Sequence, residues 1–243
     1  MTRKVGEGVG PSGTPSTLRS AAGTILGGFR RIAVGVRHLP DRLLHGLRRR
    51  RARRRLARAK PVGSALFICH GNVCRSPFAE LLFARMMAER GLFVATSSAG
   101  FIGPDRQPPA GALAAAARRG LDMTAHRSML VTAGALNTAD LVVTMSAQQV
   151  TSLRHAIGRA PGTVILLGDL DPWPIRRRTV VDPWGGDARL FDESYDRIER
   201  CLAALANVLS VSATSRSGHS RGSATRTGLH TATSTGSTSP PSV

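Results

Sequence analysis

Ala65-Leu-Phe-Ile-Cys-His-Gly-Asn-Val-Cys-Arg-Ser-Pro77 is the stretch of this chain that decides the fold. It opens with an apolar run that is short enough for one buried strand. It closes with Ser76 and Pro77, a helix N-cap residue followed by proline at the first helical position. A turn between a strand and a helix can aim several backbone N–H groups at one point. The stretch therefore predicts a pocket for a tetrahedral oxyanion, with Cys69 at its base and Arg75 on its rim.

The residue types of this loop suit a phosphate monoester. N–H donors and a planar guanidinium can hold three phosphate oxygens, and arginine does this with two parallel hydrogen bonds where lysine cannot. The same donors favour a thiolate at Cys69, so the nucleophile needs no separate base. We expect Ser76 to donate its hydroxyl to that thiolate, and Asn72 to hold a left-handed loop conformation.

The segment Cys69-His-Gly-Asn-Val-Cys-Arg-Ser-Pro-Phe-Ala-Glu80 resembles the signature of the low-molecular-weight protein tyrosine phosphatases. The resemblance covers about residues 63–210 and includes residues 97–100, 126–128, 139–145 and 181–184. It implies that Cys69 is the nucleophile, Arg75 the phosphate clamp and Asp182 the general acid, with no metal and no organic cofactor. The phosphate-binding residues that it implies are His70, Gly71, Asn72, Val73, Cys74, Arg75 and Ser76.

Two Asp-Pro pairs compete for the role of the acid, because the leaving group must be protonated from another loop. The family places its acid shortly before the last helix, so the resemblance favours Asp182 over Asp171. Asp-Pro also favours ordinary turns, which accounts for Asp171. The family often has tyrosine after this Asp-Pro pair, whereas this chain has Trp184, whose indole can stack on an aromatic leaving group.

Strand and helix patterns alternate after residue 65. The apolar periodicity predicts strands at 65–68, 93–98, 141–144 and 163–167, and helices at 77–90, 109–119, 132–138, 146–157 and 188–209. Such alternation predicts a three-layer α/β/α fold with a central four-stranded parallel sheet and the phosphate-binding loop after the first strand. In such a sheet, this loop lies at the carboxyl edge, where ligands bind.

Charge divides the chain into three parts. Residues 1–60 contain 16 basic and 2 acidic residues, residues 61–212 contain 15 and 13, and residues 213–243 contain 3 and none. We expect a disordered Arg-rich extension over 1–60, the phosphatase domain over 61–212 and a disordered Ser/Thr/Gly-rich tail over 213–243. Three cysteines indicate a reducing compartment, and no apolar run is long enough to span a membrane, so the expected location is cytoplasmic.

The basic extension contains seven arginines within residues 48–55. It suits an anionic membrane surface or another polyanion, but not specific nucleic-acid binding, since no aromatic residue interleaves the arginines. A plain solvated tail, or a start of translation downstream of residue 1, explains the composition equally well.

Several other residues are interpreted through the resemblance. Cys74 either pairs with Cys69 in a protective disulfide, as a family cysteine here can, or simply fills the loop. Ser98 corresponds to a serine that braces the loop asparagine, and His126 to a position near the site that is structural. Cys201 is expected to be a buried small apolar residue. The histidines lack metal-ligand spacing.

The sequence therefore predicts a protein tyrosine phosphatase that acts through a cysteinyl-phosphate intermediate on phosphotyrosine-containing proteins. The family's bacterial use suggests kinases of exopolysaccharide assembly as substrates. A protein arginine phosphatase is an alternative, although those enzymes typically place threonine where Val73 stands. A thioredoxin-coupled arsenate reductase would need further cysteines, of which the second half offers only Cys201. A phosphate-recognising binding protein with a basic arm is the alternative outside enzymes.

Overall fold

A parallel sheet of four strands forms the centre of the molecule in a computed structural model that describes residues 39–157 and 163–222. The strands are β1 (Ser64–Ile68), β2 (Ala95–Ala99), β3 (Leu141–Thr144) and β4 (Thr163–Leu166), in the spatial order β2-β1-β3-β4. Ile68 is in register with Ala99 on one side and with Thr144 on the other. The loop after β1 therefore leaves the middle of the carboxyl edge.

Alternate residues of β1 enter two different cores, as the period of two in a strand requires. Ala65 and Phe67 belong to the larger core, which also contains residues of α4 (Arg75–Ala88), α5 (Ala110–Ala117) and α8 (Ala188–Gly222). Leu66 and Ile68 belong to the smaller core, with residues of α6 (Ala133–Thr138) and α7 (Ala147–Ile157). A short 3-10 helix, η1 (Leu167–Leu170), follows β4. The predicted three-layer α/β/α class with a parallel sheet is confirmed.

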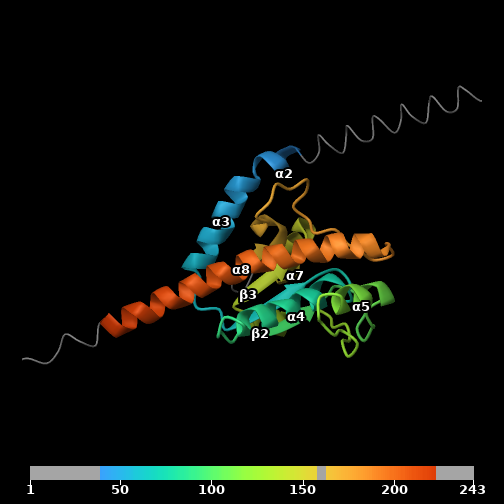
Figure 1. Cartoon of the computed structure of the whole chain (residues 1–243), viewed down its shortest axis with the longest axis horizontal. Helices are drawn as coiled ribbons and strands as arrows, with labels where there is room; N and C mark the ends of the chain where they lie inside the picture. The colour runs from blue at the N-terminus through green and yellow to red at the C-terminus, as the bar shows by residue number, and fades with distance from the viewer. Residues whose placement is uncertain (1–38, 158–162, 223–243) are drawn as a thin grey trace, which may run out of the picture.

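The long helix α8 covers one face of the sheet, and Figure 1 shows it extending well past the other elements. Its predicted apolar stripe is buried, with Ile198, Leu202 and Leu205 fully inaccessible and Val208 nearly so. The helix was expected to end near residue 209 but continues to Gly222. Part of the segment predicted as a disordered tail, residues 213–222, is therefore helical, and residues 223–243 lie outside the described residues.

Two helices occupy residues 39–58, where the sequence predicted disorder. They are α2 (Leu39–Leu43) and α3 (His45–Arg58), and α3 contacts both α8 and η1. Leu56 is 1% exposed and His45 is 8% exposed, because both face the domain. His45, Ala52 and Leu56, at i, i+7 and i+11, form the face that docks on the domain, although most of the other residues of α3 are arginines. Residues 1–38 of the predicted extension lie outside the described residues.

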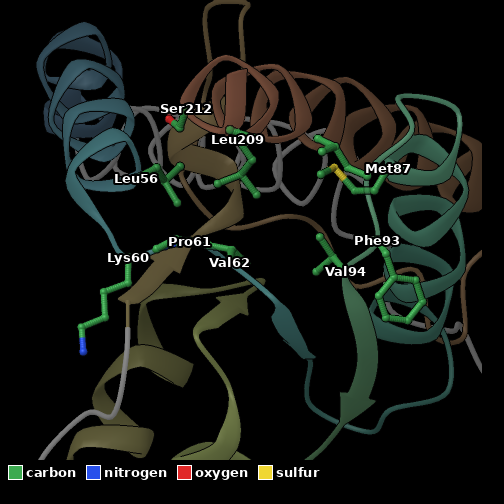
Figure 2. Close-up of a pocket in the computed structure, with 11 residues that line it drawn as sticks. Leu56, Lys60, Pro61, Val62, Met87, Phe93, Val94, Leu209 and Ser212 are labelled. Carbon is green, nitrogen blue, oxygen red and sulfur yellow. The ribbon is translucent and has the colours of Figure 1, made fainter. Parts of the chain in front are cut away.

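An apolar hollow of about 390 Å³ lies where α3, α4 and the end of α8 meet, and Figure 2 shows its lining. Val62 lies just before β1 and Val94 just before β2, so the hollow is at the amino edge of the sheet. The oxyanion loop is at the opposite edge, and this hollow is therefore separate from it. In the described ranges no helix is long and apolar enough to cross a membrane.

Candidate active site

The loop between β1 and α4 is tied to the end of β2. The Cys69 N–H donates to the carbonyl oxygen of Ala99 (3.3 Å), and the Phe101 N–H donates to that of His70 (2.8 Å). Gly100 lies between these bonds, where a Cβ atom would come within 2.8 Å of both the Asn72 nitrogen and the His70 oxygen. Only glycine therefore lets the second strand approach the loop this closely.

Cys69 lies at the base of the loop and is 2% exposed. Its sulfur accepts hydrogen bonds from the Asn72 N–H (3.2 Å) and the Ser76 hydroxyl (3.0 Å). The expected donation from Ser76 is thus present. The predicted capping role is not, since α4 begins at Arg75 and no side chain caps it. The N–H groups of the first turn of α4 have no acceptor within the helix, and they supply further donors for an oxyanion.

Asn72 holds the loop in shape from a fully buried position. Its φ of 51° is the left-handed conformation that was expected. Its amide donates to the hydroxyls of Ser76 (2.9 Å) and Ser98 (2.8 Å), and its side-chain oxygen accepts from the Met129 N–H (2.7 Å). Ser98 braces the asparagine, as the resemblance implied. These bonds fix three separate segments around the sulfur.

The segment 126–130 packs against the same loop. His126 donates from Nε2 to the backbone oxygen of Asn72 (2.7 Å), which places it beside the loop and in contact with its backbone. Glu80, on the second turn of α4, lies near His126 and Ser98. Burial raises the pKa of the Glu80 carboxyl above its usual range, although the hydrogen bond with Ser98 and the charge of His126 oppose the shift.

Arg75 connects the loop to the second Asp-Pro segment. Its guanidinium, 5% exposed, donates from Nη1 to the backbone oxygen of Val180 (3.1 Å) and from Nη2 to the carboxylate of Asp182. Its Nε–H has no partner in the described part of the chain. The Asp182 side chain is 43% exposed and accepts from the Trp184 N–H through its other oxygen (3.3 Å). The second Asp-Pro segment is therefore paired with the loop that contains Cys69.

Asp171 is placed elsewhere, in the interior beneath α8. Its carboxylate is fully buried and accepts from Arg197 (2.9 Å) and from Arg200 (2.9 and 3.1 Å). His45 of α3 donates from Nε2 to its backbone oxygen (2.9 Å). This aspartate is committed to an internal ion pair, and it is not at the mouth of the loop.

Two residues that the sequence did not single out complete the surroundings. Arg106 donates to the backbone oxygen of Gly71 (3.0 Å), and its guanidinium lies 5.7 Å from the centre of the Trp184 ring. Tyr195 stacks on Phe78 with ring centres 3.8 Å apart and donates to the Cys74 oxygen (3.1 Å). Neither has a local pattern that marks it, because both reach the loop from distant parts of the sequence.

The remaining cysteines are free thiols in buried positions. Burial raises the pKa of Cys74 to about 12, and the neighbouring Cys69 and Asp182 add to the shift. Burial likewise raises the pKa of Cys201 to about 12, in agreement with its expected apolar role. Among the residues that the structure describes, no group of histidine, cysteine, aspartate or glutamate side chains could hold a metal ion.

A thiol at the base of an oxyanion loop, on the carboxyl edge of a parallel sheet, defines a cysteine-dependent phosphatase. The family model for low molecular weight phosphotyrosine protein phosphatase matches residues 64–215, and the chain belongs to this family. It is accordingly a protein phosphatase, a hydrolase of phosphoric monoesters.

Curated relatives match a similar share of the chain. The protein-arginine-phosphatase of Bacillus subtilis (strain 168) is 32% identical over 145 residues, which cover 59% of this chain and 95% of that protein. The low molecular weight protein-tyrosine-phosphatase Wzb of Salmonella typhimurium is 30% identical over 145 residues, covering 59% and 92%.

Solved structures of phosphatases resemble this chain over a similar share of its length. The solution structure of a low molecular weight protein tyrosine phosphatase from Bacillus subtilis has a TM-score of 0.55 at 30% identity, covering 61% of this chain and 97% of that one. A mutant of the YwlE arginine phosphatase with a phosphorylated active-site serine has a TM-score of 0.56 at 30% identity, covering 60% and 95%.

Proposed function

We propose that this protein hydrolyses phosphotyrosine in proteins through a phosphocysteine intermediate on Cys69. One observation carries the proposal. The Cys69 sulfur receives two hydrogen bonds at the base of an oxyanion loop, and Arg75 of the same loop pairs with Asp182. The proposed nucleophile and phosphate clamp come from one short loop, and the proposed proton donor comes from a segment 107 residues beyond Arg75.

In the first step, the Cys69 thiolate attacks phosphorus in line with the bond to the leaving oxygen. A sulfur–phosphorus bond forms as the phosphorus–oxygen bond breaks, and protonated Asp182 gives its proton to the departing phenoxide. Arg75 and the loop N–H groups of residues 70–76 hold the equatorial oxygens, where charge is concentrated in the transition state. When phosphate binds, the Arg75 guanidinium must release Asp182 at least in part and donate to the phosphate oxygens instead.

In the second step, the Asp182 carboxylate takes a proton from water as its oxygen attacks phosphorus. The sulfur–phosphorus bond breaks, and Cys69 leaves as a thiolate that accepts the hydrogen bonds from Ser76 and Asn72. The products are inorganic phosphate and the regenerated enzyme. The chain's own side chains supply every proton transfer in this scheme.

The rim of the site suits an aromatic substrate. Trp184 is 57% exposed and follows Asp182 by two residues, so its indole can lie against a phenyl ring. Arg106 holds this indole from the other loop. Relatives called protein-tyrosine-phosphatases include EpsP of Ralstonia solanacearum and Wzb of Salmonella typhimurium. We propose phosphotyrosine proteins, including kinases of exopolysaccharide assembly, as substrates in the cytoplasm.

Phosphoarginine is the second candidate substrate, favoured by the 32% identity to a protein-arginine-phosphatase. Val73, 4% exposed, stands where those enzymes typically have threonine, and it offers a phosphoguanidinium no hydroxyl. Arsenate reduction is a weaker candidate, since Cys201 is fully buried in α8.

For residues 1–60 we propose an anionic partner. We also propose that Cys74 can form a disulfide with Cys69 under oxidation.

The test is hydrolysis of a phosphotyrosine peptide and of a phosphoarginine peptide by reduced protein. Cys69→Ser should abolish turnover, and Asp182→Ala should lower kcat by roughly 10²–10⁴-fold. Glu89→Ala, which removes an exposed carboxylate at the carboxyl end of α4, the end away from the loop, is the control and should leave kcat unchanged. Faster hydrolysis of phosphoarginine would establish the second candidate, and inactivity on both substrates would refute the phosphatase proposal.

A further inference from the structure

The helices that precede the family region expose a face of unusual composition. From residue 42 to residue 63 the chain has no acidic residue, and Asp41 is engaged with Arg48 and with the Arg178 N–H. Helices α2 and α3 follow each other directly, with Leu44 between them as a turn residue (φ −90°, ψ 0°). The Leu44 N–H donates to the Pro40 oxygen and the Arg48 N–H to the Leu44 oxygen (3.0 Å each), which links the two helices.

The inward face of α3 is occupied by the phosphatase domain. His45, Ala52 and Leu56 recur at helical spacing and point toward α8 and η1. The His45 bond to Asp171 fixes the amino end of α3, and burial of Leu56 fixes its carboxyl end. The helix is thus firmly attached to the domain, and Figure 1 shows it at the edge of the molecule.

The outward face contains leucines at one end and arginines at the other. Leu43 and Leu47 are 73% and 53% exposed, and Leu39 and Leu44 are exposed beside them. Arg50, Arg54 and Arg58 continue the same face at spacings of three and four residues, and all three are exposed. In the described part of the chain, no ion pair neutralises these three arginines. Four arginines of α3 also line a shallow hollow of about 500 Å³ beside Thr163.

We propose that this outward face of α2 and α3 docks on a bilayer that contains anionic phospholipid. The leucines enter the boundary between headgroups and acyl chains, and the arginines bind headgroup phosphates. A nucleic-acid partner would account only for the arginines. A phosphate backbone offers the exposed leucines no apolar contact, and the segment has no aromatic residue for stacking on bases. The proposal goes beyond the phosphatase activity, since it assigns a membrane surface as the partner of a region outside the family match.

Co-sedimentation of the full chain with phosphatidylcholine vesicles, with and without 30 mol% phosphatidylglycerol, tests the proposal. The wild type should bind only the anionic vesicles, and less tightly as salt increases. Arg50→Gln/Arg54→Gln should weaken vesicle binding about 25-fold, at about fivefold for each arginine. Arg90→Gln/Arg189→Gln, with the same loss of charge at exposed positions away from α2 and α3, is the matched control and should bind as the wild type does. Variants rather than a truncation are used because residues 1–38 also contain arginines.

A leucine variant separates a membrane from a simple polyanion. Leu43→Ser/Leu47→Ser should weaken vesicle binding about tenfold and leave binding to heparin unchanged, because only the bilayer receives apolar side chains. Hydrolysis of a small soluble phosphate ester by each variant should match the wild type, which shows that the domain is folded. Equal binding to neutral vesicles, or loss of vesicle binding in the charge control, would overturn the proposal. So would a leucine variant that binds vesicles normally, which would leave a polyanion as the partner.

Discussion

Exchanging aspartate for asparagine at the two Asp-Pro pairs should separate stability from catalysis. Asp171 is fully buried, and its carboxylate accepts three hydrogen bonds from Arg197 and Arg200. Asp171→Asn leaves two arginines without their counter-charge, and breaking a buried pair in this way costs about 3–5 kcal/mol. For a domain of this size, each kcal/mol lowers Tm by about 2–4 °C, so Tm should fall by about 6–20 °C.

Asp182→Asn should behave in the opposite way. Its side chain is 43% exposed, so losing the ion pair with Arg75 should cost less than about 1 kcal/mol and lower Tm by less than about 4 °C. Without a proton to donate, kcat should fall by roughly 10²–10⁴-fold.

The assay is differential scanning calorimetry on both variants, with kcat on a phosphotyrosine peptide measured for all proteins at one temperature, 20 °C below the lowest Tm. Folded Asp171→Asn should keep kcat within a few-fold of wild type at the same temperature. If Asp171→Asn lost activity without losing stability, and Asp182→Asn did the reverse, the assignment of the acid would be refuted.

Three further predictions concern the support of the loop and the packing of the domain. Asn72→Ala should lower the free energy of unfolding in urea by about 2–4 kcal/mol, since it removes three buried hydrogen bonds and strains a φ of 51°. Asn72→Gly should cost about 1–2 kcal/mol less, and equal losses would argue against the strain. Leu56→Ala should cost about 2–5 kcal/mol by the same measurement, and a negligible loss would mean that α3 is not docked. Glu80→Gln should raise the urea midpoint at pH 7.5. Burial raises the pKa of Glu80, so the stability that depends on its proton is complete below pH 4.5 and is lost as the pH rises through the folded-state pKa. That gain should disappear near pH 4, and a gain independent of pH would contradict this explanation.

The segment from β1 to α4 could be predicted from the sequence because its determinants are local. An apolar run followed by a loop and a periodic apolar pattern fixes a strand, a turn and a helix within about 25 residues. The spacing of Cys69 and Arg75 predicts that both face one point, and in the structure both lie between the end of β1 and the start of α4. The alternation of later segments was likewise enough for a parallel sheet of four strands.

Where the sequence was misleading, a tertiary contact overrode a local preference. Ser76 has the pattern of a capping residue, but its hydroxyl donates to the Cys69 sulfur, and α4 begins at Arg75, two residues before the predicted start. The arginines of α3 predicted disorder, but burial of Leu56 against the domain outweighs their solvation. The periodicity and charge of a segment predict how it behaves alone in water. They contain no information on the surface of the domain against which it packs.

The sequence by itself determined the fold class, the oxyanion loop and the thiol at its base, since each depends on neighbours along the chain. Only the tertiary structure decided which aspartate faces Arg75, and it alone brought Arg106 and Tyr195 to the loop. These groups meet across 35 to 121 residues of chain. Contacts at such separations depend on how the sheet orders its strands and how α8 packs on them, and no local spacing encodes that arrangement.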